Sequence, residues 1–240
     1  MKRHIPNLIT SLNLASGFIA IIYSINGDLL TASWLIVAAM VFDFFDGFSA
    51  RALKAYSDVG KELDSLADVV SFGVAPGLLV FMMTGNAVTM NGDTYSAYQG
   101  LTRVLFMAIA AFMPVCAAIR LAVFNLDSTQ SKSFKGLPTP ANAIAVISVI
   151  FASRYGESAL VDWFTSTPAA ILAFSFVLSV LMVTRIPLSS LKFSNLKFRE
   201  NLDRYLLVIF VVLLFIVAGP SGLPLIIPVY IIISLLAGRF

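Results

Sequence analysis

The sequence predicts an all-α integral membrane protein. Of its 240 residues, 59% are hydrophobic and only 12% are charged, and the mean hydropathy is +0.91. A soluble domain of this length needs far more polar surface than this composition supplies. Apolar runs follow one another with short connections, and we find no repeat or low-complexity tract between them. We therefore expect a single membrane domain built from helices.

Eight apolar runs of about spanning length define the predicted helices. In chain order they lie near residues 5–25, 29–52, 62–84, 101–125, 138–154, 168–186, 203–219 and 222–238. The first run follows two basic residues as a signal peptide would, but it carries Asn7 and Asn13 and lacks a small-x-small cleavage site. We therefore expect it to be retained as a helix. The fifth run and the last two are short or interrupted by proline.

The distribution of basic residues orients these helices, because cytoplasmic loops are enriched in Lys and Arg. With the N-terminus inside, most basic residues fall on the cytoplasmic side, and only Arg103 and Arg154 lie near outer boundaries. Residues 85–100 are then outside, while 126–137 and 187–204 are inside. The cytoplasmic basic residues are Lys2, Arg3, Arg51, Lys54, Lys61, Lys132, Lys135, Arg185, Lys192, Lys197, Arg199, Arg204 and Arg239. Both termini are thus predicted to be cytosolic, as expected for a prokaryotic cytoplasmic membrane.

Two residue types limit the chemistry available to the chain. Cys116 is the single cysteine, which excludes an intrachain disulfide and a thiolate metal cluster. His4 is the single histidine, which argues against a histidine-centred triad and a histidine-rich zinc site. Carboxylate oxygens are the remaining metal ligands, and they favour hard cations such as Mg²⁺ or Mn²⁺.

Four aspartates lie where the second run ends and the third begins, all on the predicted cytoplasmic side. On the second helix, Asp43 and Asp46 share an arc of about 140° with two small residues and an arginine. On the third, Asp64 and Asp68 follow a glycine at intervals of four and form a narrow stripe. The neighbours on these two faces are Gly47, Ala50, Arg51 and Gly60. Two facing helices could present four carboxylates to one pocket, where divalent cations would neutralise them.

These eight residues form the pattern Asp-x2-Asp-Gly-x2-Ala-Arg-x8-Gly-x3-Asp-x3-Asp, from Asp43 to Asp68. The pattern resembles the signature of the CDP-alcohol phosphotransferase family at every fixed position. Further stretches are similar to the branch of that family that uses serine as the acceptor. They are residues 5–10 with Asn13 and Leu14, residues 57–77, residues 120–125 and residues 134–140. The resemblance covers roughly the first 140 residues.

The resemblance implies a six-helix core, a homodimer, and transfer of a phosphatidyl group from CDP-diacylglycerol to the L-serine hydroxyl with release of CMP. It implies that Asp43, Asp46, Asp64 and Asp68 hold two divalent cations, Mg²⁺ or Mn²⁺, and that Asp68 is the general base. We accordingly place the six-helix catalytic core in residues 1–186. Residues 187–240 would add an interfacial basic segment and a C-terminal helical hairpin to the same membrane domain. A solvated linker is the alternative for residues 187–204.

Other polar residues complete the predicted site. Those expected to bind the nucleotide or the diphosphate are Asn7, Thr10, Gly47, Ala50, Arg51 and Gly60. The first-helix face that carries Asn7, Thr10, Asn13 and Gly17 lines this pocket or, alternatively, makes hydrogen bonds between helices. The residues expected to bind the acceptor are Arg120, Asn125 and Lys135. Snorkelling or structural pairing is the alternative for Arg120, and a plain basic loop residue is the alternative for Lys135.

Two rival functions use the same residues. The first is the same chemistry on glycerol 3-phosphate or inositol phosphate, which would demand more cationic groups than Arg120 and Lys135. The second is a cation transporter, whose acids should lie near the bilayer midplane on broken helices, whereas these aspartates lie toward one face. The expected partners are therefore the bilayer, the lipid donor and a small acceptor, with no nucleic acid.

Overall fold

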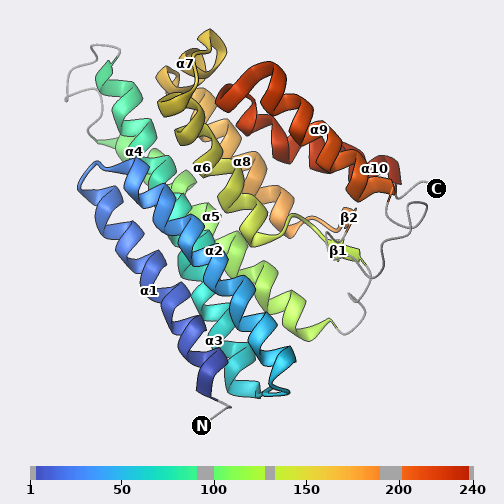
Figure 1. The fold of residues 1–240 in the computed structure, drawn as a ribbon. Coiled ribbons are helices and arrows are strands. Elements are labelled where there is room, and N and C mark those ends of the chain that lie inside the picture. Colours follow the sequence, from blue (N-terminus) through green and yellow to red (C-terminus); the bar gives the residue numbers. More distant parts are fainter. Residues whose placement is uncertain (1–3, 91–99, 128–132, 190–201, 238–240) are drawn as a thin grey trace.

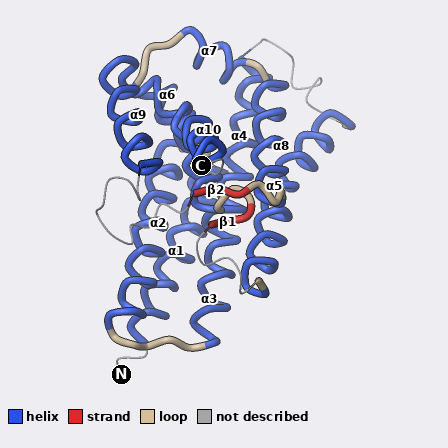
Figure 2. Tube along the Cα trace, turned by 90° about the vertical axis from the view of Figure 1, so that its right-hand side faces the viewer, coloured by secondary structure: helices blue, strands red, loops and turns tan. Residues whose placement is uncertain are grey.

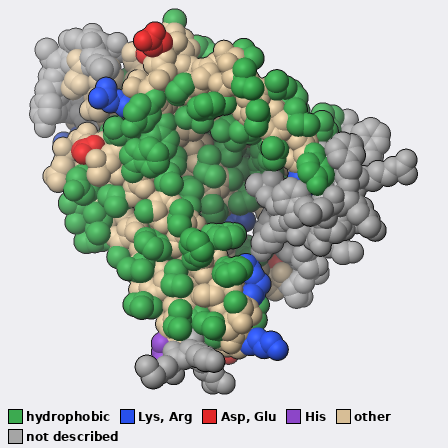
Figure 3. Space-filling model, in the orientation of Figure 1, with side chains coloured by type: hydrophobic (Ala, Val, Ile, Leu, Met, Phe, Trp, Pro, Cys, Tyr) green, Lys and Arg blue, Asp and Glu red, His purple; other side chains and the backbone are tan. Residues whose placement is uncertain are grey.

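The computed structural model describes residues 4–90, 100–127, 133–189 and 202–237. Helices dominate these residues and pack into one bundle, with the N-terminus and α3 at one end and α7 at the other (Figure 1). In Figure 3, hydrophobic side chains cover most of one face and charged side chains show mainly toward its two ends. This distribution suits a bundle whose middle lies in a bilayer. The predicted fold class, all-α and integral to the membrane, is confirmed.

The first two helices form a closely packed hairpin. α1 (Ile5–Ile25) has Pro6 in its first turn, where a missing backbone N–H is tolerated. The turn after α1 uses Gly27 at a φ of +84°. α2 (Leu29–Ala52) then begins, and the Asp28 carboxylate caps it by accepting the Thr31 N–H at 3.0 Å. Both helices match the predicted runs, and they lie side by side in Figures 1 and 2.

The third helical stretch is longer than predicted. α3 (Asp58–Asp68), the π-helical segment η2 (Val69–Val74) and α4 (Ala75–Met90) follow one another without a break, whereas the sequence predicted a helix at 62–84. The early start is explained by Ser57, whose hydroxyl accepts the N–H of Gly60 at 3.0 Å and caps α3. The first turn of α3 is polar, so it lay outside the apolar run from which this helix was predicted.

The segment η2 lies at the centre of the bundle. The Asn142 side-chain amide donates to the backbone carbonyl of Phe72 at 3.1 Å, which ties η2 to α6. A Cβ added at Gly73 would lie 2.9 Å from the Cβ of Ala117 on α5. Glycine is therefore needed at this position for α5 to pack so closely against η2.

The middle of the chain contains one helix that the sequence did not predict. The helices here are α5 (Leu101–Leu126), α6 (Thr139–Tyr155), α7 (Ala159–Ser166) and α8 (Pro168–Val183). α5 and α6 match their predicted runs, and α8 ends earlier than the predicted 186. The unpredicted helix, α7, is too short to span a bilayer and turns away from α6 by 120°.

Two short strands join segments that the sequence assigned to a loop and to an interfacial segment. β1 (Ser133–Lys135) pairs antiparallel with β2 (Pro187–Ser189), so that the α5–α6 connection meets the chain that leaves α8. Three-residue strands give no detectable alternation, which is why neither was predicted. Most of the predicted interfacial segment, residues 190–201, lies outside the described residues.

The C-terminal part returns on itself beside α6. It consists of α9 (Leu202–Ala218), the 3₁₀ segment η4 (Gly219–Leu225) and α10 (Ile226–Ala237). Figure 1 shows the chain entering α9 and leaving α10 on the same side. Five helical stretches of the described chain are long and apolar enough to cross a membrane, or six if α6 and α7 form one span. Six is two fewer than the eight predicted runs, because α8 is short and Arg204–Leu236 counts as one stretch, and the count of five also leaves out α6.

Candidate active site

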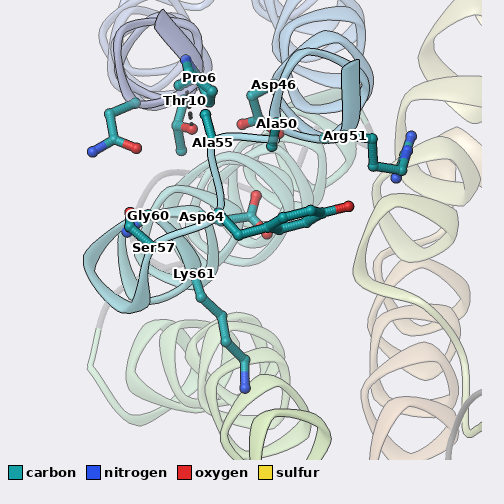
Figure 4. A pocket seen from close by; sticks show the side chains of 13 residues that line it. Pro6, Thr10, Asp46, Ala50, Arg51, Ala55, Ser57, Gly60, Lys61 and Asp64 are labelled. Carbon is teal, nitrogen blue, oxygen red and sulfur yellow. Dashed lines mark hydrogen bonds between the residues drawn. The ribbon is translucent and has the colours of Figure 1, made fainter. Parts of the chain in front are cut away.

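The aspartates meet where the last turns of α2 face α3. Carboxylate oxygens of Asp43, Asp64 and Asp68 all lie within 4.8 Å of one another, close enough to ligate a metal ion. Asp46 is not part of this trio, but it is only 6% exposed and lines the adjoining cavity together with Asp64. In Figure 4, the Asp46 and Asp64 side chains point toward the same space between α2 and α3. The helical spacing seen in the sequence thus brings the four carboxylates together.

The donor atoms at this site fit hard divalent cations. Asp46 Oδ2 and Asp64 Oδ1 are buried and accept no hydrogen bond from the described residues. Asp68 accepts one weak hydrogen bond, from the Asn13 amide at 3.4 Å. Carboxylates this close repel one another strongly in a semi-dry site, and unsatisfied buried oxygens are costly. Mg²⁺ and Mn²⁺ prefer oxygen ligands, and a bound cation would supply the positive charge that these carboxylates need.

A cavity of about 210 Å³ opens beside the carboxylates. All six residues that the sequence assigned to nucleotide or diphosphate binding line it, and they are Asn7, Thr10, Gly47, Ala50, Arg51 and Gly60. A Cβ added at Gly60 would lie 2.9 Å from Asn7 Oδ1, so a larger residue here would crowd the α1 side of the cavity. Figure 4 shows Arg51 at the edge, with its guanidinium directed away from Asp64.

The polar face of α1 divides between the two alternatives predicted for it. Asn7 and Thr10 line the cavity, and the Thr10 hydroxyl also contacts Asp46. Asn13 lies deeper and is fully buried, donating to Asp68 while its backbone carbonyl accepts the Ser71 hydroxyl at 3.0 Å. The first half of this face therefore belongs to the cavity, and the second half joins α1 to the helix that carries Asp68.

The cavity also has lining residues that the sequence did not predict. They are Pro6, Ala55, Tyr56, Ser57 and Lys61. Tyr56 is 72% exposed, so its ring is free to contact a ligand. Tyr56 falls in the spacer between Arg51 and Gly60, where the motif fixes no residue, so the spacing did not point to it. Lys61 points away from the aspartates and donates to the Asn125 carbonyl at 3.0 Å (Figure 4).

A second cavity, of about 330 Å³, contains two of the three predicted acceptor residues, Arg120 and Lys135. Arg120 is buried, its Nε has no hydrogen-bond partner among the described residues, and it interacts electrostatically with Asp68. Lys135 lies on β1 and pairs with Asp127 at 2.7 Å. Arg185, which the charge distribution predicted only to lie on the cytoplasmic side, also lines this cavity.

The third predicted acceptor residue, Asn125, is held elsewhere. Its side-chain amide donates to the Ser65 hydroxyl at 2.8 Å, and its backbone carbonyl accepts a hydrogen bond from the Lys61 ammonium. It is absent from the described lining of the second cavity. Asn125 therefore fastens α5 to α3, the helix that carries Asp64.

Comparison with known proteins agrees with this geometry. Residues 3–188 match the model of the CDP-alcohol phosphatidyltransferase family. The chain is 32% identical to the CDP-diacylglycerol–serine O-phosphatidyltransferase of Helicobacter pylori over 238 residues, which is 98% of this chain and 91% of that one. It is 31% identical to the enzyme of the same name from Bacillus subtilis over 202 residues, 83% of this chain and 96% of that one. It is 34% identical to the archaetidylserine synthase of Methanothermobacter thermautotrophicus over 155 residues, 64% of this chain and 60% of that one.

The matched region includes the whole aspartate motif, both cavities and α1 through α8. The resemblance drawn from residues 43–68 is therefore confirmed over most of the chain, and a transporter role is set aside. The chain belongs to the CDP-alcohol phosphatidyltransferase family.

Proposed function

We propose that this protein transfers the phosphatidyl group of CDP-diacylglycerol to the hydroxyl of L-serine and releases CMP. The observation that carries the proposal is that the aspartate cluster adjoins two cavities. Asp46 and Asp64 line the cavity of the predicted nucleotide residues, and Asp68 interacts with Arg120, which lines the cationic cavity. The names of the three relatives support it, since two specify serine phosphatidyl transfer and one specifies archaetidylserine synthesis.

We propose that Asp43, Asp46, Asp64 and Asp68 hold two divalent cations, Mg²⁺ or Mn²⁺. When bound, the cations would neutralise the donor diphosphate and favour displacement at phosphorus. The chain itself positions the carboxylates for this task. Asn13 orients Asp68 through its amide, and Thr10 contacts Asp46.

The donor would occupy the smaller cavity. Gly47, Ala50 and Gly60 leave room for the diphosphate beside the helices, because none of them has a bulky side chain. Asn7 and Thr10 supply polar groups from α1 for the nucleotide. Arg51 lies at the rim, where its planar guanidinium is suited to phosphate oxygens.

The acceptor would occupy the larger cavity, with its carboxylate on Arg120. In the proposed reaction the serine oxygen bonds to the phosphorus that bears diacylglycerol, and the bond from that phosphorus to CMP breaks. The proton leaves the serine hydroxyl for Asp68, the aspartate that interacts with Arg120. Lys135 would hold the mouth of this cavity through its ion pair with Asp127.

The membrane arrangement follows from the same proposal. We place both termini and the aspartates on the cytosolic side of a prokaryotic cytoplasmic membrane. The water-soluble acceptor, serine, would then arrive from the cytosol, and CMP would leave into it. We also propose a homodimer, and a catalytic core at residues 1–186 followed by a C-terminal pair of helices. The family match ends close to that boundary, at residue 188.

CMP release by the purified protein in CDP-diacylglycerol micelles tests the reaction. L-serine, glycerol 3-phosphate and inositol phosphate are added separately with Mn²⁺ or Mg²⁺. The second and third acceptors matter because Arg185 adds a cationic group to the acceptor cavity. Asp64→Asn is compared with Asp58→Asn, which alters an exposed carboxylate in the first turn of the same helix.

We expect CMP release to depend on serine and on the cation. It should be lost in Asp64→Asn and persist in Asp58→Asn. Release only with a phosphorylated acceptor would keep the transferase chemistry and overturn serine. Absence of CMP release with every acceptor would contradict the proposed reaction.

A further inference from the structure

A cavity of about 320 Å³ lies at the end of the bundle opposite the aspartates. It is formed by the start of α2, the later part of α4, the end of α6, and α7. Figure 1 shows these segments at the end away from the N-terminus and α3. The cavity shares no lining residue with the two cavities described above. Its chemistry is therefore independent of the phosphatidyl transfer site.

The lining of this cavity changes from polar to apolar. Asp28, Asn86, Ser153 and Arg154 are exposed side chains at its opening, whereas Met83 and Ile150 are 7% and 8% exposed. A polar opening above an apolar floor, at the end of a membrane bundle, matches the step from a lipid headgroup to its acyl chains.

The two charges at the opening do not neutralise each other. Among the described residues Arg154 makes no ion pair, and it lies in the last turn of α6. One carboxylate oxygen of Asp28 accepts the Thr31 N–H. Hydrogen bonds from the Thr31 side chain and backbone lower the pKa of the Asp28 carboxyl. Asp28 is therefore ionised at neutral pH, and the cavity offers a separate anion and a separate cation.

Arg154 was one of two basic residues near the predicted outer boundaries. A favourable interaction with the end of α6 explains an arginine there, and the cap on α2 explains Asp28. Neither role requires the two charges to line one cavity that also contains the buried residues Met83 and Ile150. Asp28 would repel an anionic headgroup, and Arg154 would repel a bare cation. A ligand with one negative and one positive group satisfies both residues.

We propose that this cavity binds the headgroup of a zwitterionic phospholipid from the leaflet opposite the aspartates, with its phosphate on Arg154 and its amine on Asp28. The apolar floor receives the glycerol end of the acyl chains. Asn86 and Ser153 supply neutral polar groups at the opening. This site does not depend on the proposed serine transfer.

Native mass spectrometry of the delipidated full-length protein tests the site, with short-chain phosphatidylethanolamine and phosphatidylglycerol as probes. Arg154→Gln and Asp28→Asn are compared with Arg103→Gln, which removes a basic residue outside this cavity. Asparagine remains a good helix cap, so Asp28→Asn keeps an acceptor for the Thr31 N–H. The melting temperature of each variant reports whether it is folded.

Each cavity variant should bind phosphatidylethanolamine about ten-fold more weakly than the wild type, because each loses one charged hydrogen bond. Arg103→Gln should bind like the wild type. Asp28→Asn should also lose the preference for phosphatidylethanolamine over phosphatidylglycerol. Glycerophosphoethanolamine, which lacks acyl chains, should compete poorly, whereas equal competition would mean that a free headgroup is the ligand. Unchanged binding in folded variants would overturn the proposal.

Discussion

Asp68 differs from the other three aspartates in its neighbours. The Asn13 amide donates to it from α1, and Arg120 of α5 interacts with it electrostatically. Asp64, one turn earlier on α3, lines the smaller cavity instead. Asp68 is therefore the carboxylate that connects the aspartate cluster with the proposed acceptor cavity.

Asp68→Asn should abolish turnover while nucleotide still binds. Asparagine keeps the size of the side chain but cannot take a proton, and loss of a general base typically costs at least about a hundred-fold in rate. Serine-dependent CMP release and calorimetric titration of CMP measure the two effects separately. Asp58→Asn is the matched control on α3. Turnover at the wild-type level in Asp68→Asn would show that this carboxylate is not the base.

Individual residues were predictable where spacing alone decides their position. Asp43, Asp46, Asp64 and Asp68 converge because intervals of three and four place them on single helix faces. Asn125 was not predictable, because its hydrogen bond to Ser65 depends on how α5 packs against α3. Such contacts arise between helices, and no spacing within one helix encodes them.

At the scale of helices, the contact between α1 and η2 holds the site together. A Cβ added at Gly17 would lie 2.8 Å from the Cα of Ser71, a backbone atom that cannot turn aside. The hydroxyl of the same Ser71 donates to the backbone carbonyl of Asn13, one turn earlier on α1. Gly17 thus sets the distance at which Asn13 can reach Asp68.

Gly17→Ala should push α1 away from η2 and destabilise the protein by about 1–3 kcal/mol, the usual cost of overpacking. Thermal unfolding in detergent measures this loss. Gly47→Ala is the control on α2, because its added Cβ would lie 3.6 Å from the nearest atom, Arg51 Nη1. An unchanged melting temperature in Gly17→Ala would show that the helices shift at no cost.

Helices were predicted well where one apolar run of spanning length covers nearly the whole helix, as in α1, α2 and α5. The polar beginning of α3 was missed, because hydropathy cannot distinguish a helix that leaves the bilayer from a loop. The cap formed by Ser57 on the Gly60 N–H was the available signal. α7 and the β1–β2 pair were missed because they are short and form against other parts of the fold.

Across the whole molecule, the C-terminal helices reach the proposed acceptor site. Tyr230 of α10 is 4% exposed and interacts electrostatically with Arg120 of α5. It is absent from the described lining of the acceptor cavity, so it would act by positioning Arg120. Nothing in the apolar C-terminal sequence indicated this contact, because it joins residues 110 positions apart.

Tyr230→Phe removes one hydroxyl and keeps the ring that packs in the core. We expect KM for serine to rise about ten-fold, because a polar interaction with a charged group is lost. KM for CDP-diacylglycerol and the melting temperature should stay close to wild type. Ser234→Ala removes another buried hydroxyl from α10 and is the matched control. Equal changes in both KM values would indicate a general structural defect instead.

The uninterrupted stretch Asp58–Thr89 has 32 residues. At helical rise it is about 48 Å long, while the hydrocarbon layer is about 30 Å thick. The surplus is close to the length of α3, whose 11 residues extend about 16 Å. With the apolar remainder in the hydrocarbon, Asp64 and Asp68 stand at the depth of the headgroups. A diphosphate joined to two acyl chains can then reach the carboxylates while its tails stay in the bilayer, and a water-soluble acceptor never has to enter the hydrocarbon.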